Sequence, residues 1–213
     1  MLVLRDVIER HAVSNPIALR WIERQLLANP GGAFSVKKHY DALRSQGVPV
    51  GKDTLHSYLA HLEDAFLVRT VHMHSASERQ RMVNPRKAYP VDTALISLFE
   101  RSGRTQHGRA LETAVLLELE RRRYEVSYVR TKDDYEVDFL AHRAGEPPLL
   151  IQVCLESEGD ETFARELRAL AAGKVMVPEA RALLLTMDAS VPTRRLPKGL
   201  SWVPAARWLM EGM

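Results

Sequence analysis

Four polar side chains stand at positions that a single catalytic site would need. Glu112 lies in a segment with helical periodicity. Asp138 follows another acid by two residues on a predicted strand, so both acids point to one face of that strand. Gln152 and Cys154 are also two apart, on the next predicted strand. Clustered carboxylates of this kind are the oxygen ligands that Mg²⁺ prefers, and Glu112 and Asp138 are the candidate metal ligands.

Each of these residues also has an ordinary structural explanation. Glu136 and Asp138 would form the solvated face of an amphipathic strand. Cys154, the single cysteine, is more typical of a small buried hydrophobe than of a reactive thiol. Arg165 and Glu166, on a later predicted helix, would either face the same cleft or form a surface ion pair.

The elements that must position these residues are predicted in the second half of the sequence. The order is helix, three strands, helix and two strands, followed by a last short helix, which indicates a mixed sheet with helices on its faces. The ranges are about His107–Arg123, Glu125–Arg130, Tyr135–Arg143, Pro148–Leu155, Glu161–Leu170, Arg181–Thr186 and Leu200–Pro204.

The first half has a different pattern, with helices followed by β character. Ser14-Asn15-Pro16 separates two amphipathic helices, and a later helix is predicted over about Asp53–Asp64. Residues 66–90 read as two extended pieces joined by a polar tip. Three helices and a hairpin are the outline of a winged helix, with Asp53–Asp64 as its recognition helix. We therefore predict an α+β protein with a winged-helix domain at 1–90 and a mixed α/β domain at 91–213.

The charge is distributed unevenly between these two parts. The net charge is +3, but residues 1–90 carry 13 Lys and Arg against 8 Asp and Glu, whereas 91–213 carry 17 against 19. A basic half favours contact with nucleic-acid phosphates, or it is simply a solvated surface. Acids on the recognition helix oppose the first interpretation. The candidate phosphate contacts are Lys37, Lys38, Lys52, Arg69, Arg79, Arg81, Arg86 and Lys87.

Several classes of function are disfavoured by the sequence. No run approaches the roughly 20 apolar residues of a membrane helix, and the N-terminus lacks the apolar core of a signal peptide. We therefore expect a cytoplasmic protein without membrane contact. Residues 47–53 depart from a phosphate-binding loop in spacing and in their final Asp53, so we expect no ATP binding. His72 and His74 share a strand face, but solvated or phosphate-facing histidines explain them better than a metal site.

The candidate site resembles that of the PD-(D/E)XK nuclease fold. That resemblance implies metal binding by Glu112 and Asp138, with an acid and a lysine expected at the third-strand positions. Gln152 and Cys154 stand there instead. Losing a ligand charge and a cation together should greatly reduce hydrolysis, since one preorganised group is commonly worth about 10²–10³ in rate. We therefore expect no working enzyme and no cofactor, with Mg²⁺ bound only if the site is active.

The chain as a whole resembles the C-terminal domain of unknown function that follows the ATPase module of many bacterial and archaeal AAA-type ATPases. The segments that carry the resemblance run in the same order and cover most of residues 3–210. They include Thr54 to Leu59, Leu62 to Val68, Asn84 to Tyr89, Gly108 to Val115, Glu136 to Phe139 and Ile151 to Cys154. The resemblance implies a winged helix and a nuclease-like domain beside an ATPase that this chain lacks, so the chain would be a fragment, a truncated relative or a stand-alone version.

Three functions remain open from the sequence. The first is a non-catalytic nucleic-acid-binding module, with DNA as the partner. The second is a docking module for an ATPase or another protein, with Trp202, Trp208 or the helix Leu2–Val13 at the interface. The third is a metal-dependent nuclease.

Overall fold

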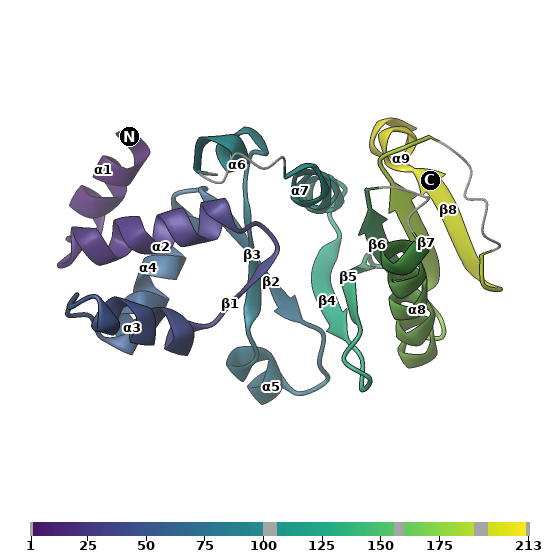
Figure 1. Cartoon of the computed structure of the whole chain (residues 1–213), viewed down its shortest axis with the longest axis horizontal. Coiled ribbons are helices and arrows are strands. Elements are labelled where there is room, and N and C mark those ends of the chain that lie inside the picture. The colour runs from purple at the N-terminus through teal and green to yellow at the C-terminus, as the bar shows by residue number, and fades with distance from the viewer. Residues whose placement is uncertain (1, 100–105, 156–159, 190–195, 212–213) are drawn as a thin grey trace. The chain divides into compact units, whose positions relative to one another are not determined.

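The computed structural model describes residues 2–99, 106–155, 160–189 and 196–211 of the chain (Figure 1). Contacts between residues divide the chain into two compact units, each of which contains two segments. The first unit combines Met1–Thr70 with Pro85–Gln106, and the second combines Val71–Asn84 with His107–Met213. The sequence-based boundary at residue 90 differs from this grouping, because each unit holds a segment from the other side of it.

The first unit is mainly helical. Its elements are α1 (Leu2–Arg10), α2 (Pro16–Ala28), β1 (Gly32–Phe34), α3 (Val36–Ser45), α4 (Lys52–Asp64), β3 (Arg86–Pro90) and α6 (Ala94–Phe99). Strands β1 and β3 pair antiparallel, with Gly32 opposite Ala88.

Local sequence signals set where two of these helices begin. The Asn15 side chain accepts a hydrogen bond from the backbone N–H of Ala18, and Pro16 occupies the first helical position of α2. Ser35 caps α3 in the same way, through the backbone N–H of Lys38. Both helix starts agree with the sequence pattern.

Apolar side chains of α2 and α4 form much of the core of the first unit. Leu19, Ile22 and Leu27 of α2 are fully buried, as are Leu55 and Leu62 of α4. Burying one such side chain contributes roughly 1.5–3 kcal/mol. This packing fixes the buried side of α4 and leaves its polar side exposed.

The segment between α4 and β3 differs from the simple hairpin that we expected. It contains β2 (Val68–Met73) and then a short helix, α5 (Glu78–Val83), where a polar tip was predicted. Ser77 caps this helix by accepting a hydrogen bond from the backbone N–H of Gln80. The Ser-x-x-Gln spacing is a helix-start signal, which explains α5 locally.

The second unit is built on a mixed sheet. Its further elements are α7 (His107–Arg121), β4 (Glu125–Arg130), β5 (Glu136–His142), β6 (Leu149–Cys154), α8 (Asp160–Met176), β7 (Arg181–Thr186), β8 (Leu200–Pro204) and α9 (Ala205–Glu211). The end of β2 pairs in parallel with β4, β4 to β6 pair antiparallel, and β6 to β8 pair in parallel. The mixed α+β class and the order of elements predicted for the segment from α7 to α9 are confirmed. The winged-helix and nuclease-like assignments stay predictions.

Two helices pack on the middle of this sheet. Helix α7 contacts β4, β5 and β6, and α8 contacts β5, β6 and β7. Gly173 permits the close approach of α8, because a Cβ there would lie 2.7 Å from the Cγ2 atom of Val137. None of the helices in the described ranges has the length and apolar character that a membrane crossing requires.

Candidate functional site

A polar pocket of about 450 Å³ opens in the second unit, between α7, the start of β5, β6 and α8. Two arginines, five carboxylates and one buried amide contribute to its lining. These side chains are Arg109, Glu112, Asp134, Glu136, Asp138, Gln152, Arg165 and Glu166. The structure therefore brings three of the four sequence-predicted catalytic residues, Glu112, Asp138 and Gln152, to one pocket.

Helix α7 supplies one wall of this pocket. Leu111, Val115 and Leu119 bury its apolar side, so the polar residues between them turn away from the core. Glu112 and Arg109 lie one helical turn apart and both line the pocket. The predicted helix thus positions its acid as expected and adds a cation beside it.

Strands β5 and β6 place Asp138 against Gln152. Phe139 pairs with Ile151, and continuing this antiparallel register by one residue brings Asp138 opposite Gln152. The Asp138 backbone N–H donates to Oε1 of Gln152 at 3.3 Å, and the Val153 backbone N–H donates to Oδ2 of Asp138 at 2.9 Å. Both side chains are therefore hydrogen-bonded to the backbone of the neighbouring strand.

Gln152 also joins the sheet to α8. Its side chain is only 3% exposed, and its Nε2 donates to Oε2 of Glu166 at 2.6 Å. The other oxygen of Glu166 accepts from the Arg165 guanidinium at 2.7 Å. The pKa of Arg165 is raised, mainly because its guanidinium donates this hydrogen bond to Glu166. Electrostatic interactions with Cys154 and Asp138 raise it further. Arg165 and Glu166 both line the pocket and also form an ion pair with each other. Both alternatives that the sequence left open are therefore correct.

Cys154 is part of the hydrophobic core and does not line the pocket. It is 7% exposed and packs in the cluster that includes Leu140, Phe163 and Leu167. A thiol in this setting behaves as a small apolar group, as the sequence indicated. The third-strand position that carries a lysine in the nuclease pattern is therefore apolar here, and the cations at the pocket come from helices.

The pocket residues depart from the magnesium site of the nuclease pattern at the third strand, where Gln152 stands in place of an acid. Mg²⁺ requires several oxygen ligands in near-octahedral geometry. Gln152 is neutral and uses its oxygen to accept the Asp138 N–H, while Asp138 accepts a backbone N–H itself. Among the residues that the structure describes, one group of three His, Cys, Asp or Glu side chains is close enough to hold a metal ion, and it lies in the first unit. The acids of the pocket do not form such a group.

The basic residues predicted to contact nucleic acid are not equivalent. Lys37 and Lys38 on α3 and Lys52 at the start of α4 are exposed. The Arg69 guanidinium lies 5.1 Å from the ring centre of Phe66. Lys87 is only 4% exposed, because it lies on the well-buried strand β3, so it does not belong to an accessible phosphate-binding surface.

The remaining basic residues lie elsewhere. Arg86 is half-buried at the start of β3 in the first unit. Arg79 and Arg81 are exposed on α5, which belongs to the second unit, and Arg81 pairs with Glu78 at 3.3 Å. These residues therefore do not all belong to one compact unit, although they lie close in sequence.

Some functional candidates were missed by sequence reasoning. Phe66 is 65% exposed and has a backbone φ of 54°, a conformation that a bulky residue rarely adopts. The sequence signal that could have revealed this pair is the separation of three positions between Phe66 and Arg69. The Lys52 ammonium similarly lies 5.3 Å from the ring centre of Tyr40, a contact between α4 and α3 that no spacing rule reveals.

The two tryptophans offered as interface residues have internal roles. Trp208 is fully buried in α9, and the Arg122 guanidinium lies 4.3 Å from its ring centre. Trp202 is half-buried and donates through Nε1 to Thr186 Oγ1 at 2.8 Å. These two tryptophans therefore do not form the exposed apolar interface that we considered from the sequence.

Comparison with known proteins identifies two domains in the chain. Residues 1–105 match a domain of unknown function (DUF8612), and residues 107–205 match a second domain of unknown function (DUF4143). The chain is thus similar to two families of unknown function over consecutive stretches, which meet near residue 106.

Similar proteins come from archaea and bacteria. An uncharacterised protein of Methanocaldococcus jannaschii is 31% identical over 169 residues, which are 78% of this chain and 36% of that protein. An uncharacterised protein of Haemophilus influenzae is 30% identical over 155 residues, or 73% of this chain and 38% of that protein. The chain therefore spans just over a third of the length of these curated relatives. No solved structure matches it significantly.

Proposed function

We propose that this chain is a nucleic-acid-binding module whose nuclease-like pocket is degenerate and does not hydrolyse its partner. Binding belongs to the first unit, where cations stand beside exposed or half-exposed aromatic rings. Hydrolysis is not proposed, because Gln152 and Cys154 stand where the nuclease pattern has an acid and a lysine, and the pocket residues in the second unit bond to one another.

The observation that carries this proposal is the pair formed by Phe66 and Arg69. A mostly exposed ring beside a guanidinium offers a stacking surface for a base and a charge for a phosphate. Lys52 and Tyr40 form a second pair of the same kind in the same unit. Stacking on such platforms favours unpaired bases over a closed duplex.

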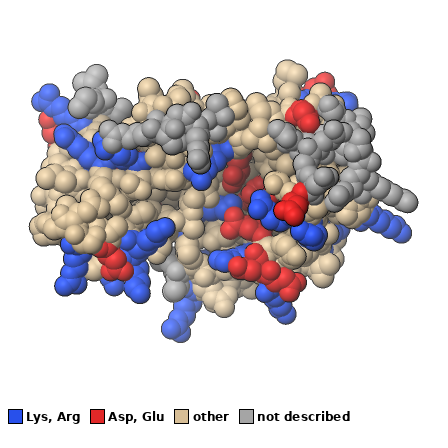
Figure 2. Space-filling view, viewed as in Figure 1, with Lys and Arg blue, Asp and Glu red and all other residues tan. Residues whose placement is uncertain are grey.

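The charge distribution on the surface agrees with this proposal. Figure 2 shows blue Lys and Arg side chains with few red ones over the part that contains α1 to α4, and red and blue side chains together near α7, β4 and β5. Exposed Lys37 and Lys38 on α3 add charge to the first unit. Neutralising phosphates releases counterions, so binding through these groups should depend strongly on salt.

The finer fold assignments belong to the same proposal. We infer that the first unit is of the winged-helix type and that the second is nuclease-like. The order α7-β4-β5-β6-α8-β7, with Glu112, Asp138 and Gln152 around one pocket, supports the second assignment. The expected wing differs from a simple hairpin, because the helix α5, which is grouped with the second unit, replaces its tip.

The binding test is fluorescence anisotropy with labelled single-stranded DNA at low salt, using the full chain. Phe66→Ala and Arg69→Ala should each weaken binding about 5- to 50-fold, as expected for the loss of a base-stacking contact or a neighbouring charge. Arg207→Ala is the matched control, since it removes an exposed cation that pairs with Glu211 in α9. Equal effects of Arg69→Ala and Arg207→Ala would refute a specific surface in the first unit.

The pocket is tested separately, by incubating DNA with the chain and Mn²⁺. We expect no cleavage, and Asp138→Ala should leave this result unchanged. Cleavage by the wild type that disappears in Asp138→Ala would show that the pocket is catalytic.

A second candidate function, docking to a protein such as an AAA-type ATPase, has its own supporting observation. Ile17 on α2 and Leu98 on α6 are 69% and 75% exposed on two helices that pack together. Domains of the second family are also commonly found with AAA-type ATPases. Concentration-dependent association in light scattering, abolished by Leu98→Asp, would favour this function, and a monomer at all concentrations that binds DNA would argue against it.

A further inference from the structure

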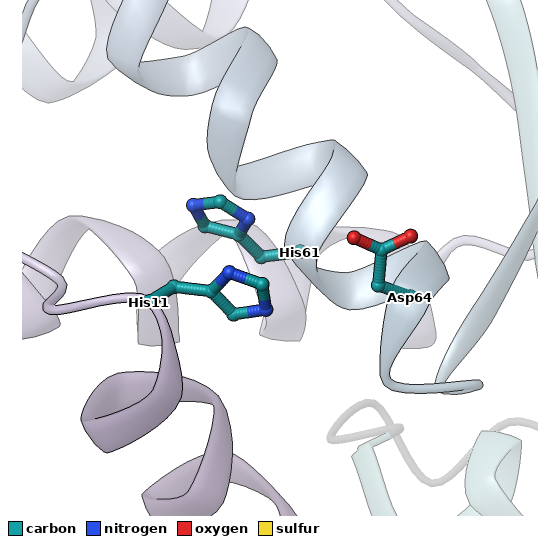
Figure 3. Close-up of side chains that lie close together, drawn as sticks. All are labelled: His11, His61 and Asp64. Atoms are coloured by element: carbon teal, nitrogen blue, oxygen red, sulfur yellow. The ribbon is translucent and has the colours of Figure 1, made fainter.

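Two histidines and an aspartate converge in the first unit, away from the polar pocket. One candidate ligand atom from each of His11, His61 and Asp64 lies within 4.8 Å of the others. Figure 3 shows the two imidazole rings one above the other, with the Asp64 carboxylate beside them. His11 is 50 positions before His61, and the fold brings it to the two residues on α4.

The position of His11 is fixed by the end of α1. The His11 backbone N–H donates to the Val7 carbonyl, and the Val13 N–H donates to the Ile8 carbonyl. Ala12 adopts a φ of 46°, the left-handed conformation that ends helices. The turn that carries His11 is therefore held by its own backbone hydrogen bonds.

A tyrosine ties this turn to α4, which carries the other two ligands. The Tyr58 hydroxyl accepts a hydrogen bond from the Asn15 backbone N–H at 2.9 Å, and its ring is buried in the core. His61 and Asp64 follow Tyr58 in the last turn of α4, three residues apart on one side of the helix. Tyr58 thereby keeps the two halves of the cluster in register.

The electrostatic setting favours a cation. His11 directly follows α1, and Asp64 is the last residue of α4, so the cluster lies beside the C-terminal ends of two helices. Helix C-termini carry a partial negative charge that attracts cations.

We propose that His11, His61 and Asp64 bind a divalent first-row transition metal of the zinc type, joining the end of α1 to the end of α4. Imidazole nitrogen suits Zn²⁺, Co²⁺, Ni²⁺ and Cu²⁺, whereas Mg²⁺ and Ca²⁺ prefer oxygen alone. Two histidines and one carboxylate are a three-ligand set that leaves a fourth position for water. The partial exposure of the cluster gives an ion access to it.

Binding requires a small rearrangement of side chains. The rings are stacked at 3.8 Å between centres with an angle of 14° between planes. Imidazole lone pairs lie in the ring plane, so the rings must tilt apart to aim at one ion. Tetrahedral coordination with bonds of about 2 Å places ligand atoms roughly 3.3 Å apart, which side-chain rotations reach from the present spacing.

The first test is a titration of the full chain with Co²⁺, followed by visible absorption. Binding should give the visible bands of a four-coordinate ion with one equivalent of metal. His11→Gln and His61→Gln should each weaken this affinity at least tenfold, and Asp64→Asn should weaken it as well. His56→Gln is the matched control, because His56 is exposed on the same helix α4 but outside the cluster.

The second readout is thermal unfolding with and without Zn²⁺. Saturation should raise the Tm of the wild type and of His56→Gln by roughly 5 °C. His11→Gln should fold without metal, as judged by circular dichroism, and should lose this shift. An absence of Co²⁺ bands in the wild type, or equal bands and shifts in His11→Gln, would overturn the proposal.

Discussion

The two units differ in what surrounds the charged side chains of their candidate sites. In the second unit, polar groups at the pocket bond to each other: Gln152 to Glu166, and Glu166 to Arg165. In the first unit, Lys52 and Arg69 stand beside aromatic rings, and two histidines meet an aspartate at the surface. Groups that bond to one another inside a pocket stabilise the fold, whereas charged groups beside exposed or half-exposed rings can also contact a partner. We therefore propose that the polar pocket contributes more to stability than to binding.

The largest expected effect concerns the amide at the centre of the pocket. Gln152→Leu should lower the free energy of unfolding by about 3 kcal/mol, because it leaves the Glu166 carboxylate and the Asp138 N–H without this partner in a mostly enclosed site. Urea denaturation measures this change. Gln46→Leu, at an exposed helix end, is the control and should cost less than about 0.5 kcal/mol. Equal losses of unfolding free energy in Gln152→Leu and Gln46→Leu would contradict the proposed difference between the two units.

The second prediction compares the loss of stability when an enclosed ion pair is broken with the loss when an exposed one is broken. Glu118 in the second unit accepts hydrogen bonds from Arg121 and Arg122, and these bonds lower its pKa, with Arg121 as the main cause. Glu118→Gln should cost about 1.5 kcal/mol at neutral pH. This stability is present above the ordinary pKa of the carboxyl group and is lost as the pH falls through the lowered value.

The matched change in the first unit is Glu9→Gln, which removes the exposed partner of Arg5. It should cost less than about 0.5 kcal/mol, because water screens exposed pairs. Thermal unfolding of the two variants at pH 7 compares them directly. A larger loss in Glu9→Gln than in Glu118→Gln would contradict the account.

The smallest effect is a pH dependence in the first unit. Burial, and to a lesser degree Lys38, lowers the pKa of His39 from 6.5 to about 4, and its ring stacks on Phe34 at 4.5 Å. The unfolded chain therefore binds this proton first as the pH falls, so stability should decrease between about pH 6.5 and pH 4. After allowance for solvent screening we expect about 1 kcal/mol from this group.

Urea titrations at several pH values measure this slope. His39→Gln should flatten it, whereas His56→Gln, which changes an exposed histidine, should leave it in place. The same slope in His39→Gln and in the wild type would show that another group is responsible.

Much of the second unit could be predicted from the sequence, because its signals are local. The period of apolar residues and flanking turns located β4, β7 and β8 at the bounds that the structure has. The alternation on two strands also placed Asp138 and Gln152 on pocket-facing positions. Between α4 and β3, the cap signal at Ser77 was present but was interpreted as a hairpin tip.

Other features depend on contacts that no local pattern contains. Lys87 looks like any surface lysine in the sequence, yet β3 is buried along most of its length. His11 and His61 are 50 positions apart, and they meet because the turn after α1 is tied to α4 through Tyr58. Sequence spacing therefore predicts which residues share an element, and packing decides which of them meet.

The most direct test of the central claim is a salt titration of DNA binding by the wild-type chain. Anisotropy of labelled single-stranded DNA, measured from low to physiological salt, gives the slope of log affinity against log salt concentration. If Lys37, Lys38, Lys52 and Arg69 contact phosphates, the slope should be about −3. Absence of binding at the lowest salt concentration would contradict the account and would direct attention to a protein partner.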